Sequence, residues 1–191
     1  MSPDPKPGRL RIIAGKWRHR QVTFPGVQGL RPTPDRVRET LFNWLQPHIE
    51  GARCLDLFAG SGALSIEALS RGAERALLLE RDPRVIAHLR NELQALGAAA
   101  DQARLIQAEA LSYLRGPAEP FDIVFVDPPF HSSLIGTACR LLDEGAWLAP
   151  GARVYLEMAW TAAGPDIPSG WRLLHHKRAG EVGYGLAGAP G

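Results

Sequence analysis

From residue 53 onward, apolar residues fall into two kinds of segment: short continuous runs, and longer stretches where they recur at helical spacing. The runs at 76–79 and 123–126 show no alternation, which predicts strands covered on both faces, as in a parallel sheet between helices. The pattern predicts seven strands, over residues 53–58, 75–80, 103–107, 121–126, 152–158, 171–176 and 182–187. Because the last two flank a turn at Ala179 and Gly180, we expect them to form an antiparallel edge pair.

A helix is predicted to begin near residue 34. Thr33 precedes Pro34, an arrangement typical of an N-cap followed by the first helical residue. The apolar residues that follow share one helical face: Val37, Leu41, Trp44 and Leu45. We expect the opposite, polar face to carry Arg36 and Arg38.

The N-terminal part has a different pattern. Residues 10–24 read as two short strands around Gly15 and Lys16, which predicts a hairpin. We therefore divide the chain into a basic hairpin extension, residues 1–30, and a main domain, residues 31–191. Asp4 is the single acid in residues 1–20, where basic residues are concentrated. Such an end suits a phosphate backbone, although charge alone does not distinguish this from a solvated basic tail.

Length and composition narrow the class of protein. A chain of 191 residues that is 45% hydrophobic and 22% charged fits one globular domain with a small appendage. Its two cysteines form no Cys-x-x-Cys pair, which favours a reducing, cytoplasmic location. We find no N-terminal signal segment and no apolar run that could span a bilayer, and therefore expect no membrane association. Since histidines and cysteines show no metal-ligand spacing, we expect no metal, and a monomer is the default.

A glycine loop indicates a nucleotide cofactor. Gly60 and Gly62 follow a predicted strand and open an apolar helix, whose free N–H groups and dipole favour a bound ligand. Glu80 ends the next strand, where an acid can accept hydrogen bonds from ribose hydroxyls. A dinucleotide site would need a third glycine where Ser65 stands. Asp56, before the glycines, instead suits the amino-acid portion of S-adenosylmethionine, so the loop favours that cofactor over NAD.

The candidate cofactor-binding residues lie on or near this loop and the next two strand ends. They are Asp56, Phe58, Gly60, Gly62, Glu80, Arg81 and Glu109. Glu109 is a candidate partner for the adenine amine, although a glutamate at a helix start is also common on protein surfaces. The alternative interpretation of the loop is a plain strand-to-helix turn in an α/β protein.

The Asp-Pro-Pro-Phe run at 127–130 follows the apolar run 121–126 and predicts the catalytic site. Asp127 and the carbonyl of Pro128 can both accept hydrogen bonds from an exocyclic amine and turn its lone pair towards a methyl sulfonium. Phe130 can stack on the base, which must be single-stranded or flipped to arrive there. Methyl transfer from a sulfonium is a direct displacement, so positioning supplies most of the catalysis. The alternative is a proline-rich turn that ends a core strand.

Taken together, the motifs resemble a known group of enzymes. The runs at 56–62 and 127–130 resemble those of class I, Rossmann-like amino-methyltransferases. The stretches at 11–18, 30–45 and 178–184 are similar to the bacterial RsmD family of 16S rRNA guanine-N2 methyltransferases. The resemblance covers nearly the whole chain. One departure is His19, which stands where glycine is frequent in that family.

The resemblance implies an α/β fold of the class I Rossmann-like kind, with a seven-stranded, mostly parallel sheet, helices on both faces and an N-terminal β-hairpin. It implies S-adenosylmethionine as methyl donor. The implied acceptor is the N2 amine of a guanine in 16S rRNA, within an assembled or partly assembled small subunit. Basic residues would then hold RNA phosphates, namely Arg11, Lys16, Arg18, Arg20, Arg31 and Arg36. Arg38 could do likewise, and Trp17 is expected to pack the hairpin onto the core.

Two other functions stay open. An N6-adenine methyltransferase of DNA or RNA would use the same turn, because the chemistry of the two amines is similar. A non-catalytic RNA-binding or assembly factor could keep a degenerate Rossmann fold. The intact Gly60, Gly62, Glu80 and Asp127 argue against that second alternative.

Overall fold

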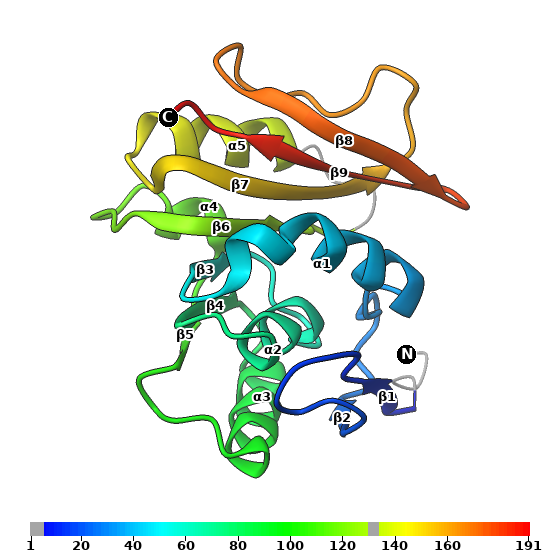
Figure 1. Cartoon of the computed structure of the whole chain (residues 1–191). Helices are drawn as coiled ribbons and strands as arrows, with labels where there is room; N and C mark the ends of the chain where they lie inside the picture. Colours follow the sequence, from blue (N-terminus) through cyan, green and yellow to red (C-terminus); the bar gives the residue numbers. More distant parts are fainter. Residues whose placement is uncertain (1–5, 130–133) are drawn as a thin grey trace.

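Seven strands form one mixed sheet in the order β5-β4-β3-β6-β7-β9-β8 (Figure 1). The computed structural model describes residues 6–129 and 134–191. The strands are β3 (Arg53–Asp56), β4 (Arg75–Glu80), β5 (Ala103–Gln107), β6 (Phe121–Val126), β7 (Leu148–Ala159), β8 (Arg172–Ala179) and β9 (Val182–Gly188). Strands β3 to β7 are parallel, whereas β9 pairs antiparallel with both β7 and β8. The predicted strands and their antiparallel edge pair are confirmed.

Helices cover both faces of this sheet, as Figure 1 shows. One face carries α1 (Asp35–Ile49), α2 (Ala63–Ser70) and α3 (Pro83–Leu96), and the other carries α4 (Ala110–Tyr113) and α5 (Leu134–Glu144). Successive residues of β6 enter different cores, so Phe125 packs with the first group and Val124 and Val126 with the second. Because each central strand is covered twice, its residues are apolar without alternation.

The N-terminal hairpin forms a separate two-stranded sheet of β1 (Gly8–Arg11) and β2 (Gln21–Phe24). The prediction of a hairpin is confirmed, but the connection spans residues 12–20 rather than a tight turn at Gly15 and Lys16. Trp17, in this connection, is only 6% exposed and joins the core shared by α1, α2 and α3. Trp17 therefore packs the hairpin onto the main domain, as expected.

The hairpin connection also approaches the backbone of α2. Gly15 has a φ of 81°, and a Cβ there would lie 1.8 Å from the carbonyl oxygen of Ser70. The N–H of Lys16 donates to that same carbonyl at 2.7 Å. His19 has a φ of 69°, a left-handed conformation that glycine adopts at lower cost. A glycine at this position, as the family resemblance implies, would relieve this strain.

The start of α1 differs from the prediction. Pro34 occupies the cap position with an extended backbone, and no side chain caps the helix. Thr33 is therefore not the N-cap, partly because a following proline restricts it to extended conformations. Its hydroxyl instead donates to Oδ2 of Asp127, 3.4 Å away. The segment before α1 thus reaches the end of β6.

Arg38 also differs from the prediction, because it is fully buried and does not lie on an exposed polar face. Its guanidinium pairs with Glu67 of α2 at 3.4 Å and with Asp35. It also donates to the carbonyl oxygens of Arg11 and Thr33. A side chain with these partners is not available to bind RNA phosphates.

Glu67 is the other centre of this network and is also fully buried. Its carboxylate accepts from the backbone N–H groups of Ile13 and Ala14, at 2.9 and 3.0 Å, and from Nε of Arg71 at 2.7 Å. A buried charge is tolerated only when it is paired and hydrogen-bonded in this way. The Arg38–Glu67 pair therefore joins the hairpin, α1 and α2.

Replacing Arg38 with methionine is expected to lower the free energy of unfolding by about 3 kcal/mol, because Glu67 loses one of its cationic partners while staying buried. Urea denaturation measures the loss. The matched control is Glu119→Gln, because Glu119 pairs with Arg75 at an exposed site where a pair contributes less than about 1 kcal/mol. Equal, small losses in both variants would contradict the role assigned to Arg38.

Candidate active site

A cavity of about 420 Å³ lies where the parallel strands end. This volume is within the range of roughly 300–1,000 Å³ that is usual for small-molecule sites. Its wall comes from the glycine loop, the ends of β4 and β6, the residues after β5, and Glu157 of β7. The segment 27–34 covers it from the side of α1. The parallel arrangement therefore brings distant sequence motifs to one site.

The glycine loop has the geometry that its sequence predicts. Gly60 and Gly62 have φ values of 50° and 75°, and Gly62 caps the start of α2. A Cβ on Gly62 would lie 2.5 Å from Cδ2 of Leu89 on α3, so a side chain there would push the two helices apart. Gly60 lines the cavity, together with Phe58, whereas Gly62 lies behind the wall and shapes the turn.

Glu80 supports the glycine loop from the end of β4. One of its oxygens accepts from the N–H of Gly60 at 3.0 Å. The other accepts from the N–H groups of Arg81 and Asp82, both at 2.8 Å. Each carboxylate oxygen has two lone pairs, so Glu80 can still accept hydrogen bonds from a ligand in the cavity. Arg81 lines the cavity beside it.

Asp56 lies at the end of β3, is 2% exposed and faces the cavity. Burial raises the pKa of this carboxyl to about 7, and the nearby Glu80 adds to the increase. Hydrogen bonds from Ser65 Oγ, at 2.8 Å, and from the backbone of Phe58 oppose it. Ser65, which stands where a dinucleotide site would have its third glycine, therefore serves to hold Asp56.

Glu109 lines the cavity but already has a structural role. It is the N-cap of α4, and its two oxygens accept from the N–H groups of Leu111 and Ser112 at 3.0 and 2.8 Å. A contact with an adenine amine would use the remaining lone pairs. That assignment stays a prediction.

The residues predicted to bind the amine also line the cavity. Asp127, Pro128 and Pro129 all line it, and Asp127 is half-buried. Burial raises the pKa of Asp127 well above its usual value, and the charges of Glu157 and Asp56 raise it further. The hydrogen bond from Thr33 opposes the rise. Phe130, the predicted stacking residue, lies outside the described residues.

Sequence reasoning missed Glu157, a second acid beside Asp127. Val126 of β6 is in register with Leu156 of β7, so the next residues, Asp127 and Glu157, are neighbours on adjacent strands. Glu157 is 5% exposed and lines the cavity, and Tyr155 donates its hydroxyl to Oε2 at 2.8 Å. Burial raises the pKa of Glu157, although hydrogen bonds from Tyr155 and Thr33 oppose this. The available signal was one acid in the otherwise apolar run 154–157.

The predicted RNA-binding residues divide into two groups. Arg18, Arg31 and Arg36 are exposed, and within residues 6–129 and 134–191 no salt bridge involves them. Arg31 also lines the cavity. These three are the cations most available for phosphates.

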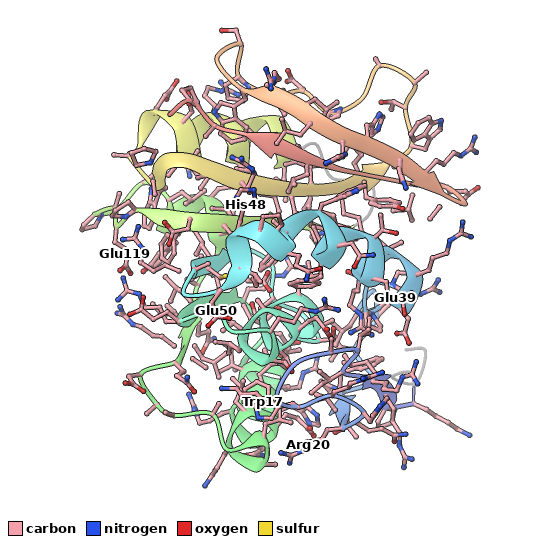
Figure 2. The ribbon with its side chains drawn as sticks, in the orientation of Figure 1. Trp17, Arg20, Glu39, His48, Glu50 and Glu119 are labelled. Carbon is pink, nitrogen blue, oxygen red and sulfur yellow. The ribbon has the colours of Figure 1, made fainter. Side chains whose placement is uncertain are left out.

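Other basic residues already have contacts within the protein. The Arg20 guanidinium donates to the carbonyl oxygens of Ala95 and Leu96, at 2.6 and 3.2 Å, and so caps the end of α3 beside the hairpin (Figure 2). Lys16 lies 4.4 Å from the ring centroid of Trp17. Arg11 is 3.8 Å from Asp35. RNA contacts by Arg20 would have to compete with a structural role.

The described residues contain no group of three or more histidine, cysteine, aspartate or glutamate side chains that could hold a metal ion. In the same part of the chain, no helix has the length and apolar character needed to cross a bilayer.

The raised pKa of Asp56 predicts a pH-dependent stability. The folded protein holds this proton up to about pH 7, whereas the unfolded chain releases it near pH 4, so the free energy of unfolding falls as the pH rises between these values. Asp56→Asn should remove this loss and gain on the order of 2–4 kcal/mol relative to the parent between pH 4 and pH 8. Urea denaturation without cofactor measures it. If variant and parent differ in the free energy of unfolding by the same amount at pH 4 and at pH 8, this explanation is wrong.

Comparisons with known proteins agree with this architecture. The family model described as "Conserved hypothetical protein 95" matches residues 10–187. Ribosomal RNA small subunit methyltransferase D of Escherichia coli (strain K12) is 48% identical over 179 residues, which cover 94% of this chain and 89% of that protein. The protein of the same name from Haemophilus influenzae is 47% identical over 182 residues, covering 94% of this chain and 93% of that protein.

A solved structure gives the same result for the fold. The structure named "Putative methyltransferase yhhF from Escherichia coli" superimposes with a TM-score of 0.89 at 45% identity and covers 96% of this chain and 99% of that one. The match includes the mostly parallel seven-stranded sheet and the helices on both its faces. By sequence and by fold, the chain belongs to the RsmD family of Rossmann-like methyltransferases.

Proposed function

We propose that the protein transfers a methyl group from S-adenosylmethionine to the exocyclic N2 amine of a guanine in 16S rRNA, within assembled or partly assembled small subunits. The observation that carries this proposal is one cavity whose lining contains both Asp56 and Glu80, after the glycine-loop strand and the next strand, and Asp127 and Pro128, after β6. The relatives named as small-subunit rRNA methyltransferases support the substrate class. A ribosomal substrate agrees with a cytoplasmic location.

The residues at the glycine-loop end suit the cofactor. Asp56 is a buried acid without a cationic partner among the described residues, and the α-ammonium group of S-adenosylmethionine would supply one. Oε2 of Glu80 keeps one lone pair for a ribose hydroxyl. When bound, the cofactor supplies an electrophilic methyl group on its sulfonium.

The residues at the other end position the acceptor. The Asp127 carboxylate and the Pro128 carbonyl accept the N–H groups of the amine, which disturbs its conjugation and directs its lone pair into the cavity. A bond then forms between this nitrogen and the methyl carbon while the sulfur–carbon bond breaks. The nitrogen passes its surplus proton to Asp127, whose raised pKa makes it a suitable acceptor.

The direct test uses labelled S-adenosylmethionine and small subunits from cells that lack their own enzyme for this modification. The rRNA is digested after the reaction and the labelled nucleoside is identified. N2-methylguanosine supports the proposal, and sequencing then maps its position. N6-methyladenosine would instead establish the alternative methyltransferase, and cofactor binding without any label would favour an assembly factor.

Asp127→Ala tests the role of the turn. We expect the methylation rate to fall at least about 100-fold, because the amine is no longer held in line with the methyl group. The dissociation constant for the cofactor should stay within about twofold of the parent, as measured by calorimetry. Retention of full activity would remove Asp127 from the mechanism.

Arg18→Glu tests the hairpin as an RNA platform. The affinity for small subunits should fall, and the dependence of that affinity on salt should weaken, because fewer phosphate contacts release fewer counterions. The matched control is Arg115→Glu, which makes the same charge change just after α4, on the opposite face of the sheet. If both variants lose affinity equally, net charge rather than the hairpin is responsible.

A further inference from the structure

The base-binding end of the cavity contains two neighbouring acids, and the mechanism above uses one of them. Glu157 lines the cavity and follows a residue that is in register with Val126, which places it beside Asp127 on strands about 4.8 Å apart. Among the described residues, neither acid forms a salt bridge. Burying two uncompensated acids side by side is unfavourable unless another partner donates to them.

The hydroxyl groups around these acids fix their directions. Tyr155 donates to Oε2 of Glu157 at 2.8 Å, and Thr33 donates to Oδ2 of Asp127 at 3.4 Å and lies near enough to Glu157 to lower its pKa. The remaining lone pairs of the two carboxylates can accept from a ligand. The cavity therefore presents two adjacent acceptor groups from two adjacent strands.

Guanine carries the complementary pattern. Its N1–H and its N2 amine are adjacent donors on one edge of the base. Adenine has an amine next to N1, which is an acceptor. An ionised second carboxylate would therefore favour guanine and oppose adenine, because two acceptors facing each other leave a buried polar group unpaired.

We propose that Glu157 is a specificity residue of the base pocket, which accepts the N1–H of the target guanine while Asp127 accepts the N2 amine. This inference rests on the proposed function. It assigns the distinction between guanine and adenine to a residue of β7, outside the Asp-Pro-Pro-Phe turn. Glu157 is thereby a substrate contact, and Tyr155 and Thr33 are the groups that position it.

The surrounding charges agree with this role. The titratable groups next to Glu157 are Asp127 after β6, Tyr155 on its own strand and Tyr184, its register partner on β9. None of these is a cation, and among the described residues the two arginines that line the cavity, Arg31 and Arg81, form no salt bridge with either acid. A ligand that brings two or three N–H donors therefore relieves the repulsion, whereas a ligand with an acceptor at N1 increases it.

The test compares two target bases in the parent protein and in a Glu157 variant. Small subunits are reconstituted with 16S rRNA that carries either guanosine or 2-aminopurine riboside at the methylated position. 2-Aminopurine keeps the amine but has an acceptor at N1. We expect the parent to prefer guanosine in kcat/KM by about 100-fold, since a hydrogen bond to a charged group and its unpaired alternative differ by roughly this factor.

Glu157→Gln should reduce that preference at least about tenfold, because the glutamine amide can donate to N1 of 2-aminopurine. Glu119→Gln, at the other end of β6 (Figure 2), is the matched control and should keep the preference of the parent. Cofactor affinity within about twofold of the parent shows that the Glu157 variant is folded. An unchanged preference in a folded Glu157→Gln protein that still makes N2-methylguanosine overturns this inference alone. Failure of the parent to make N2-methylguanosine overturns the proposed function instead.

Discussion

The buried ion pair between Arg38 and Glu67 is the interaction on which the rest of the site depends. Glu67 accepts from the backbone of the hairpin, and Arg38 donates to the carbonyl of Thr33. Thr33 in turn donates its hydroxyl to Asp127 and lies near Glu157. The Arg38–Glu67 pair does not line the cavity, but it determines how the N-terminal segment covers it.

The cavity concentrates carboxylates at the cost of stability. Asp56, Asp127 and Glu157 all have raised pKa values, chiefly because each is buried where water cannot solvate its charge. A fold selected for stability alone would place apolar residues at such strand ends. Ligands that bring cationic or N–H groups into the cavity would account for them, and the S-adenosylmethionine and amine-bearing base of the proposed function have these groups.

Much of the fold could be predicted because its signals are local. Continuous apolar runs predicted the central strands, and the glycines at 60 and 62 marked a turn whose left-handed conformations glycine favours. Arg38 was wrongly placed on a polar face because its partner Glu67 is 29 residues away, and no helical pattern reveals a pair across two helices. Thr33 was misassigned because its hydroxyl satisfies a distant carboxylate instead of its own helix.

Glu157 shows why a motif can be recognised while its specificity is not. The Asp-Pro-Pro-Phe turn contains what an exocyclic amine needs, and that need is common to guanine and adenine. The two bases differ at the neighbouring atom N1, which carries a hydrogen-bond donor in guanine and is an acceptor in adenine. The sequence of the turn does not identify a side chain that would contact N1. In a parallel sheet the next strand ends beside the turn, and since Val126 pairs with Leu156, Glu157 lies next to Asp127. With the role inferred for Glu157, specificity for the amine would depend on the pairing between β6 and β7, which becomes visible only when the two strands are placed side by side.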